Sequence, residues 1–344
     1  MDELDVRILR ALIFEGAVAP SMSQVNESLS SIAKRLEADD AKVSYRYRRM
    51  LRSGTMSDWL LMTNPGHFGC GLTDVLVDVE PESGKDDMIR KLRVVHEVVG
   101  IIDFYGRALR LTVITGGEES KSRTIELVSR ITNAETLTQV RWALPRCRME
   151  RFTETDVAVI RSLARDARKS FVDIAKELRL SARTVRNRAV KLRSENAVFT
   201  LPNVNLGGTA GLIPAVLSYS YANGGAKEAV DRAMLSRFDA SYLWGGFSDP
   251  DSGWVLIGAS TMVEVREGLK WAKAQPGLVG ARSDIVTKTL MFPEKLAELL
   301  VAKEQRGTPP DRRRAGGPSR PRSVSLPSVR SPGRATASNL PGQR

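Results

Sequence analysis

Five basic side chains occupy the stretch SARTVRNRAVKLRSE at residues 181–195, and no acidic residue appears before Glu195. A step of 100° per residue places Val185, Ala189 and Leu192 on one side of a helix. The outward side and its edges then carry Arg183, Thr184, Arg186, Asn187 and Lys191. Arginine and asparagine suit guanine and adenine edges, and threonine and lysine suit phosphates, so this set predicts contacts with double-stranded DNA. A solvated basic helix face is the alternative interpretation.

An internal repeat of roughly 150 residues surrounds this helix. Four pairs of segments recur in the same order: LDVRILRAL (4–12) with TDVAVIRSL (155–163), SIAKRL (31–36) with DIAKEL (173–178), KVSYRYRRMLRSG (42–54) with TVRNRAVKLRSEN (184–196), and GLTDVLVDV (71–79) with GLIPAVLSY (211–219). The unit is far longer than a solenoid repeat, so it predicts a duplicated two-domain module.

Each repeat begins with three short helical patterns and then a strand. In the second repeat, Ser181 is placed to cap the third helix, and Asn196 to adopt the left-handed conformation after its end. The following VFTLPN predicts a strand. Three helices and such a strand predict a winged helix-turn-helix, whose third helix enters the major groove. The occurrence of the pattern twice favours DNA contact over a merely solvated face.

The first repeat is a degraded version of the same pattern. The insertion APSMSQVNESLS separates its first two helices, and Gly54 ends its third. Its outward face supplies a secondary set of predicted DNA contacts, Lys42, Tyr45, Arg48 and Arg49. Asp39 and Asp40 precede that helix and weaken the prediction, because acidic groups repel phosphates.

Two further arginines are predicted to be structural. Arg188 and Arg46 lie about 60° from the buried direction of their helices. An acidic residue, Asp156 or Asp5, stands at the start of the first helix of each repeat. We expect an Arg188–Asp156 pair and an Arg46–Asp5 pair that join the third helix to the first.

After each helical segment the apolar period becomes alternating, which predicts strands. The first repeat predicts strand 74–79, helix 84–95, strands 98–106 and 109–115, helix 118–131 and strand 136–144. The second predicts strand 213–221, helix 226–238, strands 241–247 and 253–260, helix 262–274 and strand 281–290. Both orders are βαββαβ, the ferredoxin-like arrangement, and a last helix is predicted at 293–304.

Charge and composition limit the function classes. The net charge is +12, of which +7 lies in the Pro-, Gly-, Ser- and Arg-rich residues 304–344 and +5 in the rest. That tail is predicted to be disordered, either as a solubilising segment or as a nonspecific nucleic-acid arm. Two cysteines and two histidines, widely scattered, match no metal-site spacing, and no cofactor is expected. No apolar run is long enough to span a membrane, and a cytoplasmic location is expected.

The expected fold class is therefore α+β, with two winged helix-turn-helix domains alternating with two ferredoxin-like domains. The predicted domains are 1–64, 70–146, 150–204 and 210–303, followed by the tail at 304–344.

The combination resembles a known family. The segment TETDVAVIRSLARDARKSFVDIAKELRLSARTVRNRAVKLRSENAV is similar to the DNA-binding domain of the Lrp/AsnC (feast/famine) transcription regulators. The βαββαβ pattern resembles the effector-binding domain of that family, and the tandem arrangement resembles archaeal members. The resemblance covers roughly residues 2–292 in two copies. It implies a transcription regulator without enzymatic activity.

Further implications concern partners. The resemblance implies sheets packed back to back, here as an intrachain pseudo-dimer, with further homo-oligomerisation open. It also implies a small effector, such as an amino acid, near the loops at 104–110 and 244–254. Neither loop identifies a ligand, their glycines suit hairpin turns, and loss of effector binding is the open alternative.

Two other functions compete with regulation. Sirohaem decarboxylases of haem synthesis share this fold, but the matching strands GIIDFYGRALRLTV and SYLWGGFSDPDSGWVLIGA contain no histidine. A nonspecific chromatin or RNA binder driven by the tail is the second alternative, and it predicts steep salt dependence. Phosphate-binding loops, nucleophile elbows and zinc-protease motifs are absent from the sequence.

Overall fold

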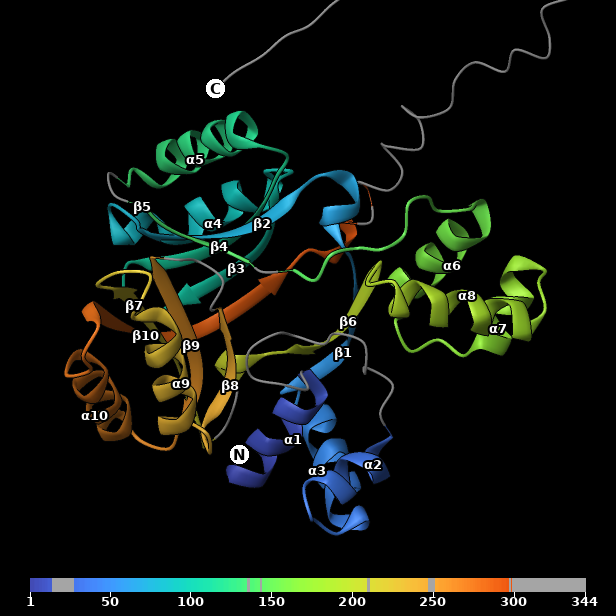
Figure 1. Cartoon of the computed structure of the whole chain (residues 1–344), viewed down its shortest axis with the longest axis horizontal. Helices are drawn as coiled ribbons and strands as arrows, with labels where there is room; N and C mark the ends of the chain where they lie inside the picture. The colour runs from blue at the N-terminus through green and yellow to red at the C-terminus, as the bar shows by residue number, and fades with distance from the viewer. Residues whose placement is uncertain are drawn as a thin grey trace, which may run out of the picture. The chain divides into compact units, whose positions relative to one another are not determined.

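The computed structural model describes residues 1–13, 28–134, 137–142, 144–208, 211–246, 251–296 and 298 (Figure 1). Helices and strands alternate as an α+β chain. Residues 293–296 are helical, and most of the predicted helix 293–304 lies outside the described residues. The predicted disordered tail at 304–344 and most of the insertion in the first repeat also lie outside them.

Three helices open each half of the chain. The first three-helix unit consists of α1 (Glu3–Ile13), α2 (Leu29–Arg35) and α3 (Asp40–Arg52). The second three-helix unit consists of α6 (Glu154–Arg165), α7 (Phe171–Leu178) and α8 (Ala182–Ser194). Side-chain caps start most of these helices, since a Ser, Thr or Asp oxygen accepts a hydrogen bond from an otherwise unpaired backbone N–H. The capping residues are Ser28, Asp39, Thr153, Ser170 and Ser181.

A strand follows each three-helix unit, as the sequence predicts, but it does not form a wing within its own unit. β1 (Met56–Thr63) pairs antiparallel with β6 (Val198–Val204), so that Leu61 lies opposite Thr200. The physical reason is that one strand leaves its backbone N–H and C=O groups unpaired. Each unit supplies a single strand, and the strand of the other unit supplies the missing partner.

Two ferredoxin-like units follow the helical units. The first ferredoxin-like unit contains β2 (Gly71–Asp78), α4 (Lys85–Val94), β3 (Val98–Phe104), β4 (Ala108–Thr115), α5 (Glu118–Thr132) and β5 (Leu137–Arg141). The second contains β7 (Ile213–Tyr221), α9 (Lys227–Arg237), β8 (Tyr242–Gly246), β9 (Ser252–Ala259), α10 (Met262–Lys273) and β10 (Leu278–Met291). Short 3-10 turns occur at Pro65–Phe68, Glu82–Gly84 and Leu206–Gly208.

The two sheets are joined into one eight-stranded sheet with the order β5-β2-β4-β3-β10-β7-β9-β8. The joint is β10, which at 14 residues is longer than the predicted strand 281–290. Its first half, Leu278–Ile285, pairs with β7, and its second half, Val286–Met291, pairs with β3. This edge-to-edge pairing was not expected, since the family resemblance implied back-to-back packing alone.

Separate apolar cores hold the layers together. One core packs α4 and α5 on one face of the first sheet, and another packs α9 and α10 on the second (Figure 1). A third core runs from both three-helix units to the helix-free sheet faces, and includes Val43, Val185, Leu76 and Leu256. Each fully buried aliphatic side chain stabilises the fold by about 1.5–3 kcal/mol, so this shared core connects the helical units firmly to the sheets.

Candidate nucleic-acid interface

α8 is positioned as the sequence predicts. Ser181 Oγ accepts a hydrogen bond from Thr184 N at 3.0 Å, and Asn196 adopts a left-handed conformation with φ 54°. Both predictions are confirmed. Val185, Ala189 and Leu192 are buried against α6 and α7. The basic side of α8 is therefore turned away from the core.

The side chains predicted to contact DNA lie mostly at the surface. Arg183, Arg186, Asn187 and Lys191 are exposed. Thr184 is half-buried, and its hydroxyl lies 2.8 Å from that of Ser181, so its hydrogen bond already supports the helix start. None of the three cations in this set pairs with an acidic residue that the structure describes. Their charge is thus available to an anionic partner.

Arg188 is held inside the second three-helix unit, as predicted. Its Nη1 lies 3.5 Å from Oδ1 of Asp156, which is fully buried. The other oxygen of Asp156 accepts hydrogen bonds from Thr153 N at 2.9 Å and Thr153 Oγ1 at 2.7 Å, which forms the capping box of α6. One carboxylate therefore starts the first helix and fixes the third, which orients α8.

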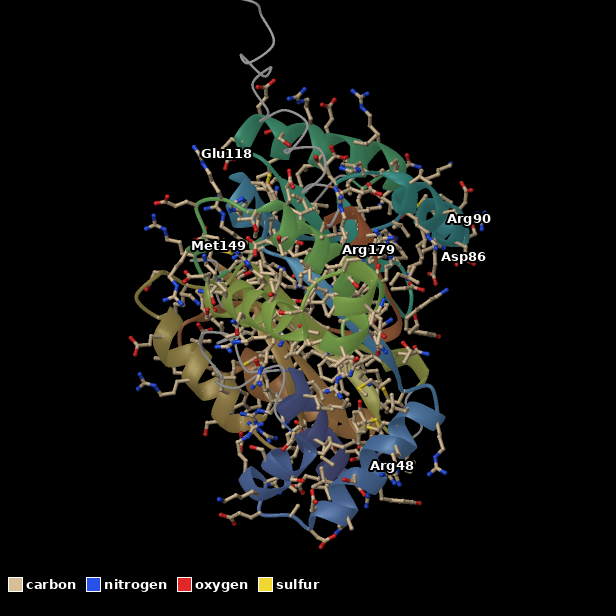
Figure 2. The ribbon with its side chains drawn as sticks, turned by 90° about the vertical axis from the view of Figure 1, so that its right-hand side faces the viewer. Arg48, Asp86, Arg90, Glu118, Met149 and Arg179 are labelled. Atoms are coloured by element: carbon tan, nitrogen blue, oxygen red, sulfur yellow. The ribbon has the colours of Figure 1, made fainter. Side chains whose placement is uncertain are left out.

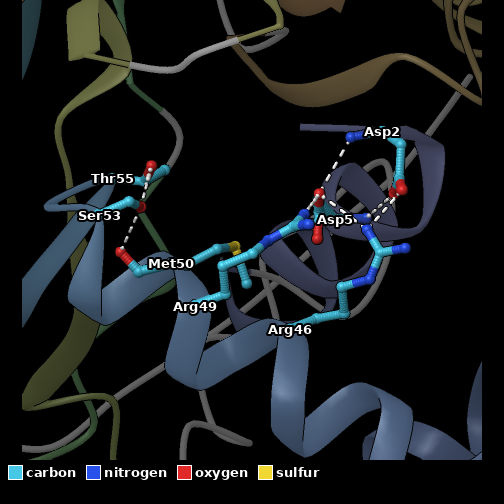
Figure 3. Close-up of polar contacts among 7 residues, drawn as sticks. All are labelled: Asp2, Asp5, Arg46, Arg49, Met50, Ser53 and Thr55. Carbon is cyan, nitrogen blue, oxygen red and sulfur yellow. Dashed lines mark hydrogen bonds and ion pairs between the residues drawn. The ribbon is translucent and has the colours of Figure 1, made fainter.

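The first three-helix unit also joins its third helix to its first through ion pairs, but with two carboxylates and two arginines (Figure 3). Arg46 Nη1 lies 3.2 Å from Oδ2 of buried Asp5, which confirms the predicted pair, and it also contacts Asp2. Arg49 forms an ion pair with Asp5 as well. The sequence placed Arg49 in the set facing DNA, but the structure gives its Nη2 an internal partner. The reason is that Asp5 has a second arginine within reach, one helical turn after Arg46.

The other residues of α3 that were predicted to contact DNA have side chains at the surface. Lys42, Tyr45 and Arg48 are exposed, and Tyr45 keeps 56% of its surface accessible. Figure 2 shows Arg48 on α3 and Arg179 between α7 and α8. Arg179, which is exposed and has φ 54°, lies outside the sequence-predicted set. The sequence signal for Arg179 was its position in the turn between α7 and α8, just before α8 begins.

A cavity of about 260 Å³ between the two sheets was missed by the sequence analysis. Arg110, 1% exposed, lines it together with Asp74, and Arg110 Nη1 lies 3.6 Å from Asp74 Oδ2. Arg110 Nη2 donates to Ser218 Oγ of the other unit at 2.7 Å, and its guanidinium lies 4.6 Å from the Trp254 ring centroid. Burial lowers the pKa of Arg110 and raises that of Asp74. The sequence signal for this cavity was the presence of two charged residues, Asp74 and Arg110, within apolar strand patterns.

The cavity adjoins both loops that the family resemblance marked for an effector. Arg110 ends one predicted loop, and Ser252 and Gly253 of the other also line the cavity. Arg110 Nε and Nη1 have no hydrogen-bond partner among the described residues. In the same loops, Gly106 forms a turn with φ 81°, whereas a Cβ at Gly246 would lie 2.4 Å from Trp254 Nε1. The glycines therefore serve aromatic packing as well as hairpin turns.

Other sites are limited in the part of the chain that the structure describes. Three or more metal-ligating side chains do not gather anywhere among these residues. The helices described are all too short or too polar to cross a membrane.

The capped third helix, its buried stripe and its exposed basic side define a helix-turn-helix domain. More particularly, the model of the AsnC-type helix-turn-helix domain matches residues 152–193, which cover α6, α7 and nearly all of α8. The second three-helix unit is thus an AsnC-type helix-turn-helix domain. Among curated proteins, none is significantly similar in sequence to the chain.

Solved structures extend the comparison to the whole fold. The siroheme decarboxylase NirDL aligns with a TM-score of 0.50 and 12% identity over 87% of this chain and 99% of that chain. Its complex with an iron-uroporphyrin III analogue gives a TM-score of 0.51, also at 12% identity, over 88% and 100%. At this identity the similarity establishes a shared fold. A transcriptional regulatory protein of the AsnC family from Pyrococcus furiosus is 19% identical over 44% of this chain and 98% of its own, with a TM-score of 0.31.

Proposed function

We propose that this protein is a sequence-specific, DNA-binding transcription regulator of the Lrp/AsnC family in a tandem form. The observation that carries the proposal is the exposed basic side of α8 in an AsnC-type domain, where Arg183, Arg186 and Lys191 form no ion pair with a described residue. Arg183, Arg186, Asn187 and Lys191 make the main contacts, with Thr184 at the helix start. Lys42, Tyr45 and Arg48 form the secondary set. Arg49 is its weakest member, because Asp5 already holds its guanidinium.

The test is enrichment of genomic DNA fragments by the full chain at about 0.15 M salt, where weak nonspecific binding is largely suppressed. The wild-type protein should enrich a few promoter fragments, and the Arg183→Ala, Asn187→Ala double variant should lose them. Arg232→Ala is the matched control, since Arg232 lies on α9 and pairs with Glu228. Uniform enrichment of all fragments by wild type and double variant would instead support the nonspecific chromatin-type binder.

The second part of the proposal is modulation by a small effector in the inter-sheet cavity. The buried Arg110–Asp74 ion pair supports it, because Arg110 Nε has no hydrogen-bond partner among the described residues, and Arg110 Nη1 and Asp74 Oδ2 lie 3.6 Å apart, beyond hydrogen-bond distance. Buried polar atoms in this state favour a ligand that supplies the missing hydrogen bonds. The two ferredoxin-like units act here as an intrachain pseudo-dimer, since the cavity is lined by both. Titration calorimetry with amino acids and other small carboxylates tests this part, and Arg110→Met should abolish any heat of binding.

A siroheme-decarboxylase-like enzyme is the second candidate. It is favoured because the alignment with this chain covers 99% of the NirDL chain. We propose that the chain is not such an enzyme and needs no cofactor. Its strands β3, β4, β8 and β9 contain no histidine. Adding siroheme to the purified protein distinguishes the candidates. A bound tetrapyrrole spectrum followed by loss of carbon dioxide would establish the enzyme.

A further inference from the structure

The two three-helix units are joined by exchanged packing. α6 of the second unit packs on β1, the strand that follows the first unit, and α1 of the first unit packs on β6, the strand that follows the second. α3 and α8 also contact the strands that follow them, β1 and β6. The β1–β6 ribbon is thus enclosed by helices from both units, and its core residues Met56, Leu61 and Val198 are nearly inaccessible.

One side chain connects the two units directly beyond this ribbon. Arg168 lies in the turn between α6 and α7, and its guanidinium carbon is 4.1 Å from the centroid of the Trp59 ring on β1. It is 5.9 Å from the Tyr47 ring on α3, and its Nη1 is 3.4 Å from the Tyr47 hydroxyl. Trp59 Nε1 also lies 3.5 Å from that hydroxyl. Trp59 is only 8% exposed, so the arginine closes over a nearly buried ring.

This contact is suited to fixing an angle. A guanidinium over an indole face is attracted by the ring quadrupole, and its planar fork allows few orientations. Tyr47 shares a helix with Lys42, Tyr45 and Arg48, whereas Arg168 belongs to the domain that carries α8. Holding Arg168 against Tyr47 and Trp59 therefore holds α3 and α8 in one relative orientation.

We infer that Arg168 is a positioning residue that locks the two helical units into one rigid DNA-reading body, so that the protein accepts a single half-site spacing. The part of this inference that concerns half-site spacing rests on the proposed function. A rigid pair tolerates neither a shift of one base pair, roughly 3.4 Å and 36°, nor the insertion of a full turn of about 34 Å. Two units joined only through the β1–β6 ribbon would pivot enough to accept the one-pair shift, but the ribbon would still keep them too close together for the full-turn insertion.

The first experiment measures the lock without DNA. Spin labels are placed at Ala41→Cys on α3 and Ala182→Cys on α8, both exposed, in full-length protein carrying Cys70→Ser and Cys147→Ser. Wild-type Arg168 should give a narrow distance distribution, and Arg168→Ala a clearly broader one. Arg165→Ala is the control, because Arg165 is a nearby exposed arginine that pairs with Glu177 inside its own unit. Equal widths for Arg168→Ala and wild type would overturn the inference.

The second experiment uses the enriched site with zero, one or ten inserted base pairs. Wild-type protein should lose at least about tenfold in affinity with one or ten added pairs. Arg168→Ala should reduce the one-pair penalty to about threefold or less, with an unchanged melting temperature. Equal penalties in both proteins would contradict the inference. Absence of specific DNA binding at any spacing would overturn the proposed function, and the distance measurement would still test the lock independently.

Discussion

The third helices of the two units, α3 and α8, share a scaffold but differ in what they offer to DNA. In the repeat alignment, Arg183, Arg186 and Asn187 of α8 correspond to Ala41, Ser44 and Tyr45 of α3. The buried positions are alike in kind, since Val185 and Leu192 correspond to Val43 and Met50. The difference teaches that packing constrains one side of such a helix while the outward side is free to diverge.

Internal acids sharpen the contrast. The first unit has Asp2 where the second has Thr153, and its two carboxylates hold both Arg46 and Arg49. At the matching place, the start of its first helix against its third, the second unit uses a single carboxylate, Asp156, which holds Arg188. Lys191, which corresponds to Arg49, forms no ion pair with a described residue. The first unit therefore uses cations for its own stability that the second leaves available for a partner.

The largest expected effect is on the stability of the first unit. Asp5→Ala leaves Arg46 and Arg49 without their buried acceptor and should lower the free energy of unfolding by about 3 kcal/mol. Asp2→Ala, a half-exposed carboxylate, should cost less than about 1 kcal/mol. Urea unfolding of both variants measures the difference. Equal losses would mean that Asp5 is not the main anchor of α3.

The next effect is on DNA affinity. Arg183→Ala should weaken binding to the enriched site by about 10- to 100-fold if its contact is to a base edge. Arg48→Ala on α3 should change it by less than about threefold, because the secondary set is weaker. Competition binding on one duplex measures both. A larger loss from Arg48→Ala would reverse the ranking of the two units.

Grafting would sharpen the comparison further. Replacing Ala41→Arg, Ser44→Arg and Tyr45→Asn gives α3 the outward residues of α8 while leaving its buried stripe intact. Selection from a random duplex library should then yield sites whose two halves are more alike than those of the wild type. Unchanged site symmetry would show that α3 does not reach base edges.

Salt dependence gives a smaller effect. Lys191→Ala should reduce the slope of log affinity against log salt by about 1, since one phosphate contact is lost. Lys42→Ala should reduce it by less, because Asp39 and Asp40 lie beside it. Affinity measured at salt concentrations from about 50 to about 300 mM tests both predictions. Equal slope changes would show that these acids do not shield the first unit.

The smallest expected effect concerns pH. Burial alone would raise the pKa of Asp2, but hydrogen bonds from Arg46 and from the Asp5 backbone outweigh it and lower that pKa below 3.8. The carboxylate thus contributes stability above its unfolded pKa, and this is lost as the pH falls through its lower folded value. The melting-temperature advantage of wild type over Asp2→Asn should therefore shrink below pH 4, on the order of the unfolded pKa. A constant difference down to about pH 3 would contradict this assignment.

Much of this architecture could be predicted from the sequence, because local rules determine it. Ser181, Asn196 and the Arg188–Asp156 and Arg46–Asp5 pairs follow from caps and helical spacing. What could not be predicted depends on contacts between distant segments. Periodicity gives each strand but not its partner, so the β1–β6 and β3–β10 pairings were not foreseen.

The candidate sites divide in the same way. The exposed basic side of α8 follows from one helix and its buried stripe. The Arg49–Asp5 pair, the Arg168–Trp59 contact and the Arg110–Asp74 cavity each join residues brought together by tertiary packing. A charge that points outward on a helical wheel is thus free only if no neighbouring element supplies a counter-charge.

The double membership of β10 has a consequence for synthesis on the ribosome. The ribosome makes the N-terminal part of the chain first. The strand β3 is therefore complete long before residues 286–291, which pair with its edge. Until then the nascent first ferredoxin-like unit has a strand edge with unpaired backbone groups, which favours association with other chains. Synthesis of β10 therefore completes the second sheet first, through residues 278–285, and a chain that stops before residue 286 would leave the β3 edge of the first sheet unpaired.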